Sequence, residues 1–449
     1  MSTSALPTLS ALYAAHISQL QQHTADLLQQ QGYAGLLIHS GSAPGLFLDD
    51  HHLPFYANPH FKHWLPLPRH QHGFLLIRPN AKPQLYYHNP SDYWHLSDGT
   101  PHGFWTAEFE ITEISAPEQV REALSMLLRG GDLAFIGEDT ALAARWGIVP
   151  AHINPESLLH PLHWQRAYKS EYELACLREA SRRAVAGHRA AEQAFRQGDS
   201  ELEIHLAYLA ASQQRENELP YGNIIALNQH GAVLHYQHLE RQPPRALHAF
   251  LIDAGAEVRG YCADITRTYA AAGGLFGEMI VALDQVQQRL VAQLQPGQSF
   301  VALHQQTHLA IGLILQAFKL VDMSPESQVE CGITRAFYPH GLGHLLGLQV
   351  HDVAGKVSDA AGTPLPPPAE HPALRLTRPL EAGMVLTIEP GLYFIDALLA
   401  ELRQSPQQVA LDWSLIAQLS PCGGIRIEDN LVIHPDRVEN LTRDAFGGP

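Results

Sequence analysis

Cysteine is scarce in this chain, with four residues among 449. Cys176, Cys262, Cys331 and Cys422 lie far apart and form no CxxC pair, which excludes a zinc-finger type of cluster and a disulfide-stapled scaffold. We therefore expect free thiols in a reducing compartment, and the cytoplasm is the compartment that fits.

Basic side chains are also in the minority, with 29 Lys and Arg against 45 Asp and Glu and a formal charge of -16. This balance argues against nucleic acid or an anionic membrane surface as the main partner and favours small or neutral ligands. No apolar run is long enough to span a bilayer. The first residues, MSTSALPTLSALYAAHISQLQQH, lack the basic start and unbroken apolar run of a secretory signal.

The length and the order of the patterns predict two domains. Up to about residue 160, a helical pattern over 10–32 alternates with strand-like runs such as YAGLLIHSG, HGFLLIRP, PQLYYHNP and LAFIGED. Long helical patterns then follow over 167–197 and 201–216. We expect an N-terminal α/β domain over residues 1–165 and a second domain of mixed helix and sheet over 166–449.

The second domain is predicted to contain strands at NIIALNQ, AVLHYQH and HAFLIDAGAEVRGYCADITRTYA, followed by two helices between about 276 and 320. The proline-rich TPLPPPAEHP is predicted to be a loop, because proline cannot join the interior of a sheet. Two further strands are predicted at MVLTIEPGLYF and GGIRIEDNLVI.

The segment FYPHGLGHLLGLQVHD places three histidines among glycine, leucine and valine. The HxxxH spacing of His340 and His344 is weak evidence by itself, since a chain with 28 histidines contains such pairs by chance. His304 and His308 show the same spacing in HQQTHLAIGLILQAF, where we predict a helix that carries both on its surface. The residues around the histidines must therefore decide their role.

Two aspartates flank a predicted turn in FLIDAGAEVRGYCADITRT. If the hairpin pairs symmetrically about residues 257–260, Asp253 and Asp264 lie directly opposite each other, with Cβ atoms ~4.5–5.5 Å apart. Like charges on a largely apolar face repel, so two facing carboxylates indicate either a cation between them or a shared proton.

The last two predicted strands carry further acids. Glu389 ends an apolar run in GMVLTIEPG, and in GGIRIEDN the alternation projects Arg426 and Glu428 from one face, where a simple salt bridge is the alternative. Four carboxylates with one neutral histidine would balance two divalent cations, and such an oxygen-rich set suits manganese, cobalt or iron. Two adjacent ions would lower the pKa of a bridging water, which predicts hydrolysis.

The spaced set DAGAEVRGYCADITRT, PHGLGHLLGLQVHD, TIEPG and GGIRIEDN resembles the signature of the metal-dependent pita-bread peptidases, which include methionine aminopeptidase, aminopeptidase P and prolidase. The segments HSGSAPGLFLDDHHLPFYANPHFKHWLP and LPYGNIIALNQ are similar to the bacterial Xaa-Pro dipeptidases, some of which are called organophosphorus acid anhydrolases. The resemblance covers essentially the whole chain. It implies a creatinase-type N-terminal domain, a role for that domain in dimerisation and pocket access, and a pita-bread catalytic domain.

The resemblance also implies roles for individual residues. The metal ligands that it implies are Asp253, Asp264, His344, Glu389 and Glu428, with two divalent ions, Mn²⁺ first and Co²⁺, Fe²⁺ or Zn²⁺ as alternatives. The catalytic and pocket residues that it implies are His235, His340 and His351, which stabilise charge on the attacked carbonyl, Glu389 as proton shuttle, and Arg426 beside the metals. The substrate-binding residues that it implies are Arg375, which grips the proline carboxylate, Tyr221, and Asp50, which comes from the opposite subunit of a homodimer or is otherwise a solvated loop acid.

The implied reaction is hydrolysis of Xaa-Pro dipeptides. An Xaa-Pro bond is a tertiary amide without an N–H, so it calls for a dedicated peptidase. Aminopeptidase P, which accepts longer peptides, is the nearest alternative. Phosphotriester hydrolysis is a side reaction that pocket volume would decide, and a binding protein of the same fold without activity is the alternative of another class.

Overall fold

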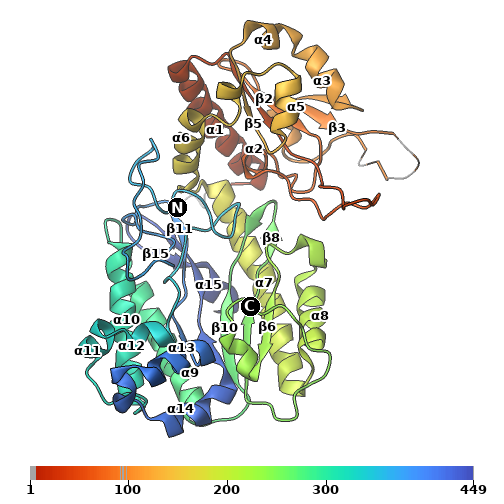
Figure 1. Cartoon of the computed structure of the whole chain (residues 1–449). Coiled ribbons are helices and arrows are strands. Elements are labelled where there is room, and N and C mark those ends of the chain that lie inside the picture. The colour runs from red at the N-terminus through yellow and green to blue at the C-terminus, as the bar shows by residue number, and fades with distance from the viewer. Residues whose placement is uncertain (1–6, 92, 94–95, 98, 448–449) are drawn as a thin grey trace, which may run out of the picture. The chain divides into compact units, whose positions relative to one another are not determined.

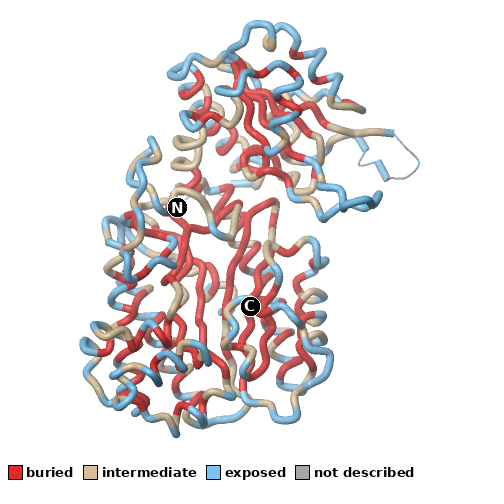
Figure 2. The backbone as a smooth tube through the Cα atoms, in the orientation of Figure 1, coloured by how far each residue is buried: buried red, intermediate tan, exposed pale blue. Residues whose placement is uncertain are grey.

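The computed structural model describes residues 7–91, 93, 96–97 and 99–447 of the chain. It divides the chain into two compact units, each of which has its own interior (Figure 1, Figure 2). The N-terminal unit comprises Met1–Arg166, Ser170–Cys176 and Ala360–Gly362, and the C-terminal unit comprises the remaining residues. The first segment ends at Arg166, next to the domain boundary that we expected between residues 165 and 166.

The N-terminal unit contains one five-stranded mixed sheet with the strand order β4-β3-β2-β1-β5. Leu37, Phe74 and Phe135 of these strands belong to one buried cluster with Val120 and Leu142 of the helices. The strands are β1 (Gly35–His39), β2 (Phe74–Ile77), β3 (Gln84–His88), β4 (Glu110–Ile114) and β5 (Leu133–Ile136). The helices are α1 (Leu9–Gln31), α2 (Pro59–Trp64), α3 (Pro117–Ala123), α4 (Ser125–Gly130), α5 (Thr140–Arg145) and α6 (Glu156–Arg166). An α/β arrangement was predicted here, although β4 was not.

The C-terminal unit contains small antiparallel sheets rather than one continuous sheet. The strand orders are β10-β7-β6, β11-β14-β15, β12-β13 and β8-β9. The strands are β6 (Ile224–Leu227), β7 (Ala249–Asp253), β8 (Glu257–Val258), β9 (Tyr261–Cys262), β10 (Thr266–Ala270), β11 (Val385–Ile388), β12 (Gly391–Tyr393), β13 (Gly424–Arg426), β14 (Asp429–Ile433) and β15 (Val438–Asn440).

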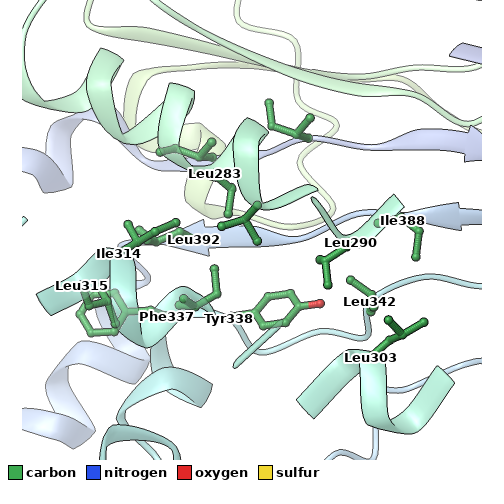
Figure 3. Close-up of a cluster of buried hydrophobic side chains, with 14 of the residues drawn as sticks. Leu283, Leu290, Leu303, Ile314, Leu315, Phe337, Tyr338, Leu342, Ile388 and Leu392 are labelled. Carbon is green, nitrogen blue, oxygen red and sulfur yellow. The ribbon is translucent and has the colours of Figure 1, made fainter. Parts of the chain in front are cut away.

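Long helices accompany these sheets, and their apolar faces make most of the core of this unit. The helices are α7 (Glu171–Gln197), α8 (Glu201–Ser212), α9 (Leu275–Ala292), α10 (Phe300–Ala317), α11 (Pro325–Glu330), α12 (Ile333–Phe337), α13 (Asp396–Gln404), α14 (Trp413–Leu419) and α15 (Leu441–Gly447). Leu283 and Leu290 of α9, Leu303 of α10 and Ile388 of β11 belong to one buried cluster (Figure 3). None of the helices in the described ranges has an apolar stretch long enough to cross a bilayer.

The register of the aspartate hairpin differs from our prediction by two residues. Asp253 pairs with Thr266, and the same ladder continues through Glu257 opposite Cys262. The turn is therefore centred on Arg259 and Gly260, which both have positive φ (54° and 92°), as a two-residue type I′ turn requires. Asp264 consequently lies diagonal to Asp253 rather than opposite it, still on the same face because side chains alternate with a period of two.

Three further predictions of secondary structure need correction. AVLHYQH contains no strand, because residues 228–232 form a short 3₁₀ helix and a loop follows. MVLTIEPGLYF and GGIRIEDNLVI each break into two strands, so that β11 pairs with β14 while β12 pairs with β13. Each break lies beside the acid of interest, since Glu389 follows β11 and Glu428 lies between β13 and β14.

His304 and His308 are buried, contrary to our prediction that they lie on the surface of their helix. Each side chain is 1% exposed. Their spacing to Ile311 and Leu315 along α10 is i, i+4, i+7 and i+11, which places all four on one face of a helix. That face is the one that packs into the core.

Helix α10 offers a matched pair of leucines for testing this core. Leu315 is fully buried, whereas Leu313 is 57% exposed. We expect Leu315→Ala to lower the free energy of unfolding by about 2–5 kcal/mol, because it leaves a cavity. Leu313→Ala should change it by less than about 0.5 kcal/mol. Urea unfolding followed by circular dichroism checks this, and equal effects of the two substitutions would contradict the packing of α10.

Candidate metal centre

A cavity of about 280 Å³ in the C-terminal unit collects most of the predicted site residues. They reach it from β7, from the segments after β9 and β11, from the link between β13 and β14, and from the loops 339–351 and 371–375. The predicted residues that line it are His235, Asp253, Asp264, His340, His344, His351, Arg375, Glu389, Arg426 and Glu428.

Tyr221 joins the two aspartates of the hairpin. Its hydroxyl oxygen lies 2.7 Å from Oδ1 of Asp253 and 2.5 Å from Oδ1 of Asp264. Burial and the two carboxylates raise the pKa of Tyr221 well above its ordinary value, so the hydroxyl keeps its proton. Tyr221 therefore holds the carboxylates of Asp253 and Asp264 together, although the two residues are not directly opposite each other in the hairpin.

Arg426 and Glu428 project from the same face, as the alternation predicted. Arg426 donates from Nη2 to Oδ2 of Asp253 at 2.7 Å, and Thr266 donates its hydroxyl to Oε2 of Glu428 at 2.7 Å. The predicted alternative of a salt bridge between Arg426 and Glu428 is not the arrangement seen, because the guanidinium pairs with Asp253 instead.

His344 faces two of the acids with one ring nitrogen. Its Nε2 lies 3.5 Å from Oδ2 of Asp264 and 3.6 Å from Oε1 of Glu389, while Nδ1 lies 3.0 Å from the carbonyl oxygen of Leu345. A carbonyl only accepts, so Nδ1 carries a proton and Nε2 presents its lone pair when the ring is neutral. This second contact is the kind that orients a metal-binding imidazole.

The glycines of the loop serve backbone packing. A Cβ at Gly343 would lie 2.0 Å from the carbonyl oxygen of Thr387, because the loop pairs closely with β11 through His344 and Thr387. Gly341 and Gly343 thus let the loop approach the segment around Leu374 and β11.

Burial controls the protonation of the acids. Burial, and then the neighbouring carboxylates, raise the pKa of Glu428 well above its ordinary value. Burial likewise raises the pKa of Glu389 to about 7, although His344 opposes the shift, and it raises that of Asp253 against Arg426. For Asp264, burial is outweighed by the protonated form of His344, whose Nε2 lies 3.5 Å away, and by the hydroxyl of Tyr221, so the pKa is lowered. The cluster thus carries more acid groups than its burial allows to be ionised together.

Asp264, His344 and Glu428 have the geometry of a candidate metal site. One ligand atom from each lies within 4.8 Å of the others, and all three side chains are buried. Asp253 and Glu389 line the same cavity and supply further oxygen donors. An oxygen-rich donor set with one imidazole is chemically suited to hard or intermediate divalent cations.

The remaining predicted residues lie around the candidate metal site or outside it. His340 contacts the hydroxyl of Tyr393 through Nε2 at 2.8 Å, and burial lowers its pKa to about 3. His351 packs edge-on against His344, with ring centroids 4.5 Å apart. Arg375 is exposed at the cavity wall. Asp50 belongs to the N-terminal unit, where its carboxylate is 96% exposed and lies 3.2 Å from Nδ1 of His51.

Three residues that contact the site or hold the loop of His235 were missed by the sequence reasoning. Tyr393 bridges Arg426 and His340, because Arg426 donates to its oxygen at 2.8 Å. Thr266 holds Glu428, as described above. Glu201 is 1% exposed and accepts hydrogen bonds from the backbone of Leu227 and from Tyr236, next to His235. Glu201 opens the helical pattern ELEIHLAYLAASQQRE, and nothing in that pattern indicates that its side chain is buried.

Comparison with known proteins gives the class to which the fold and site belong. Residues 175–435 match the family model described as metallopeptidase family M24, and residues 11–164 match the model described as Xaa-Pro dipeptidase, N-terminal domain. The chain belongs to metallopeptidase family M24. The predicted family and the predicted fold, an N-terminal α/β domain with a pita-bread domain, are confirmed.

The curated relatives narrow this class. The chain is 48% identical over 439 residues to the Xaa-Pro dipeptidase of Shewanella loihica, which covers 98% of this chain and 99% of the relative. It is 48% identical over 442 residues to the Xaa-Pro dipeptidase of Aeromonas hydrophila, covering 98% and 100%. It is 46% identical over 441 residues to that of Escherichia coli strain SE11, covering 98% and 99%.

Solved structures share the fold at lower identity. Zinc-substituted aminopeptidase P of E. coli in complex with product has a TM-score of 0.72 at 22% identity, covering 96% of this chain and 95% of that chain. Proline aminopeptidase P II of Yersinia pestis has a TM-score of 0.71 at 23% identity, covering 96% of each. These two likenesses concern the fold alone.

The raised pKa of Glu389 predicts a pH-dependent effect on stability. A carboxyl whose pKa is raised by folding stabilises the folded state fully below its ordinary pKa, and this contribution is lost as the pH rises through about 7. In chelator-treated protein we therefore expect Glu389→Gln to raise the free energy of unfolding by about 1–3 kcal/mol at pH 8 and by little at pH 5. Urea unfolding at the two pH values measures the difference. The exposed Glu401→Gln is the control, and an equal gain for both variants would contradict the burial argument.

Proposed function

We propose that this protein hydrolyses Xaa-Pro dipeptides with two divalent metal ions held by Asp253, Asp264, His344, Glu389 and Glu428. The observation that carries the proposal is the convergence of these five side chains on one cavity. The relatives that align over the full chain at 46–48% identity are named Xaa-Pro dipeptidases, which supports the same substrate class.

The donor set supports two ions rather than one. Four carboxylates in one buried cavity can be ionised together only if their charge is neutralised, and two divalent ions supply the matching charge. Asp264, His344 and Glu428 form the buried triad and would hold the ions together with Asp253 and Glu389. The oxygen-rich set favours Mn²⁺ over the metals that prefer nitrogen or sulfur ligands, with Co²⁺, Fe²⁺ and Zn²⁺ as alternatives.

The ions, when bound, supply the Lewis acidity that polarises the scissile carbonyl and lowers the pKa of the attacking water. The chain's own groups then move protons and hold the substrate. Glu389 would take a proton from the attacking water and deliver it to the leaving proline nitrogen. His340 lines the same cavity, and its neutral ring is fixed there because Nδ1 donates to the carbonyl of Gly341 and Nε2 accepts from the hydroxyl of Tyr393.

The selectivity for a short Xaa-Pro substrate rests on the cavity wall. The tertiary amide offers no N–H for recognition, so a dipeptidase must recognise the ends of the substrate. Arg375 is the exposed cation at the wall, and its guanidinium suits the proline carboxylate. His235 and His351 line the same cavity and bring two further imidazole rings to the substrate. Phosphotriester hydrolysis at this centre would be a side activity of the same chemistry.

The protein is further proposed to be cytoplasmic and homodimeric, with Asp50 completing the pocket of the opposite subunit. Free cysteines support the compartment. The exposed carboxylate of Asp50 supports its availability to a second subunit. Elemental analysis of the purified protein tests the metal, and sedimentation velocity tests the dimer.

The ligand role of Asp264 predicts loss of metal and activity together. Asp264→Asn keeps the shape of the side chain but removes the charge of the central ligand, so we expect Leu-Pro hydrolysis to fall by at least about 10³-fold. Metal content measured by mass spectrometry should fall in parallel. The exposed Asp322→Asn is the control. Leu-Pro turnover at the wild-type rate in Asp264→Asn would reject the proposed centre.

The length of the substrate separates the dipeptidase from an aminopeptidase P-like activity. We expect Ala-Pro to be hydrolysed and Ala-Pro-Ala to be hydrolysed at least about 100-fold less efficiently, since the tripeptide moves the carboxylate away from Arg375. Arg375→Ala should raise KM for Ala-Pro by about 10–100-fold with a smaller change in kcat, whereas the exposed Arg241→Ala should change neither. Comparable kcat/KM for the two peptides would instead support the aminopeptidase P-like alternative.

A further inference from the structure

A second cluster of buried histidines lies outside the carboxylate centre. His304 and His308 lie one turn apart on α10, and His371 comes from the proline-rich loop TPLPPPAEHP. The side chains are 1%, 1% and 8% exposed. Their ring centroids lie 4.5–4.7 Å apart, and one ligand nitrogen from each lies within 4.8 Å of the others.

The lone pairs of these rings are available. Burial lowers the pKa of His304 to about 3 and that of His308 to about 2, so both rings are neutral at physiological pH. Nδ1 of His304 is buried and has no hydrogen-bond partner in the part of the chain that is described. Nδ1 of His308 contacts the hydroxyl of Thr334 at 3.1 Å, which leaves Nε2 to face the cluster. Three desolvated imidazoles with an unpartnered nitrogen are costly unless something binds them.

The cluster borders a cavity of about 210 Å³. The hydroxyl of Tyr338, buried and without a partner among the described residues, lies at the wall of this cavity. Arg335 and Glu370, both exposed, bring one charge of each sign to its rim. The space and the unpartnered hydroxyl suit a water that would complete the coordination of an ion held by three nitrogens.

We propose that His304, His308 and His371 form a separate transition-metal site that binds Zn²⁺ or another cation that prefers nitrogen ligands. Zinc–imidazole bonds of about 2.0–2.1 Å place ligand nitrogens about 3.4 Å apart in a tetrahedron. Side-chain rotations that move each nitrogen by about an ångström would bring the three rings into this geometry. The site does not rest on the proposed peptidase function, because it shares no ligand with the carboxylate centre.

The two centres differ in the metals that they select. Three imidazoles without a carboxylate favour Zn²⁺, Cu²⁺ and Ni²⁺, whereas the carboxylate centre favours harder cations. They are also neighbours, since Pro339, His340 and Ala373 line both cavities. Between His371 and Arg375 there are only three residues, so an ion on His371 would fasten the segment that carries the predicted carboxylate grip.

The test is a Zn²⁺ titration of the full chain after removal of metals by a chelator. Asp264→Asn serves as the background in which the carboxylate centre is weakened, and isothermal titration calorimetry counts the equivalents that remain. We expect one equivalent to remain, and we expect His371→Asn in that background to weaken its Kd by at least about 100-fold. The exposed His248→Asn is the matched control for binding by surface imidazoles and should leave that equivalent unchanged.

Electron paramagnetic resonance with Cu²⁺ gives a readout that identifies the ligands without relying on His371→Asn. One Cu²⁺ bound to the background protein should show hyperfine coupling to three nitrogen ligands, and His304→Gln should reduce this number if His371→Asn fails to fold. The proposal is overturned if His371→Asn binds Zn²⁺ as tightly as its parent. It is also overturned if the retained Zn²⁺ depends on His351 in the peptidase cavity rather than on His371.

Discussion

The gathering of four carboxylates at one place, two of them buried and two half-buried, is the constraint on which the rest of the C-terminal unit depends. An isolated buried charge costs several kcal/mol, and neighbouring like charges add to that cost. Contacts from the surrounding side chains offset this cost for each carboxylate in turn. Arg426 neutralises Asp253, His344 pairs with Asp264, Thr266 donates to Glu428, and Tyr221 links both aspartates. The small sheets and the loops between them position these partners next to the acids.

The interrupted strands are part of the same arrangement. Had MVLTIEPGLYF and GGIRIEDNLVI been two continuous strands, Glu389 and Glu428 would have alternated within flat sheets. Instead each of the two segments passes from one sheet to another, the first at Glu389 and the second at Glu428. A chain that leaves a sheet frees its carboxylate from the regular pleat, so the acids can point toward a common centre.

Much of this organisation could be predicted from the sequence. Apolar runs located β1 to β3 and β5, and alternation placed Arg426 and Glu428 on one face. The register of the aspartate hairpin could not be read from symmetry, because the positive φ of Arg259 and Gly260 shifts the turn by one residue. The loop with His235 was mistaken for a strand, because its conformation depends on hydrogen bonds to the distant Glu201. The spacing of His304 and His308 to Leu315 along the helix indicates that they share its buried face. We nevertheless predicted that they lie on the surface, because histidine is a polar residue.

The internal partners of the acids bear on how the protein acquires its ions. Arg426, Tyr221 and Thr266 are supplied by the chain itself, so the cluster is partly compensated before any cation arrives. Folding and metal loading are then separate events, unlike those of a zinc finger, which is unfolded without its metal. A protein of this kind can reach its final shape first and take its ions from the pool of the cell afterwards. The composition of that pool, as well as the ligands, would then decide which element the folded protein carries.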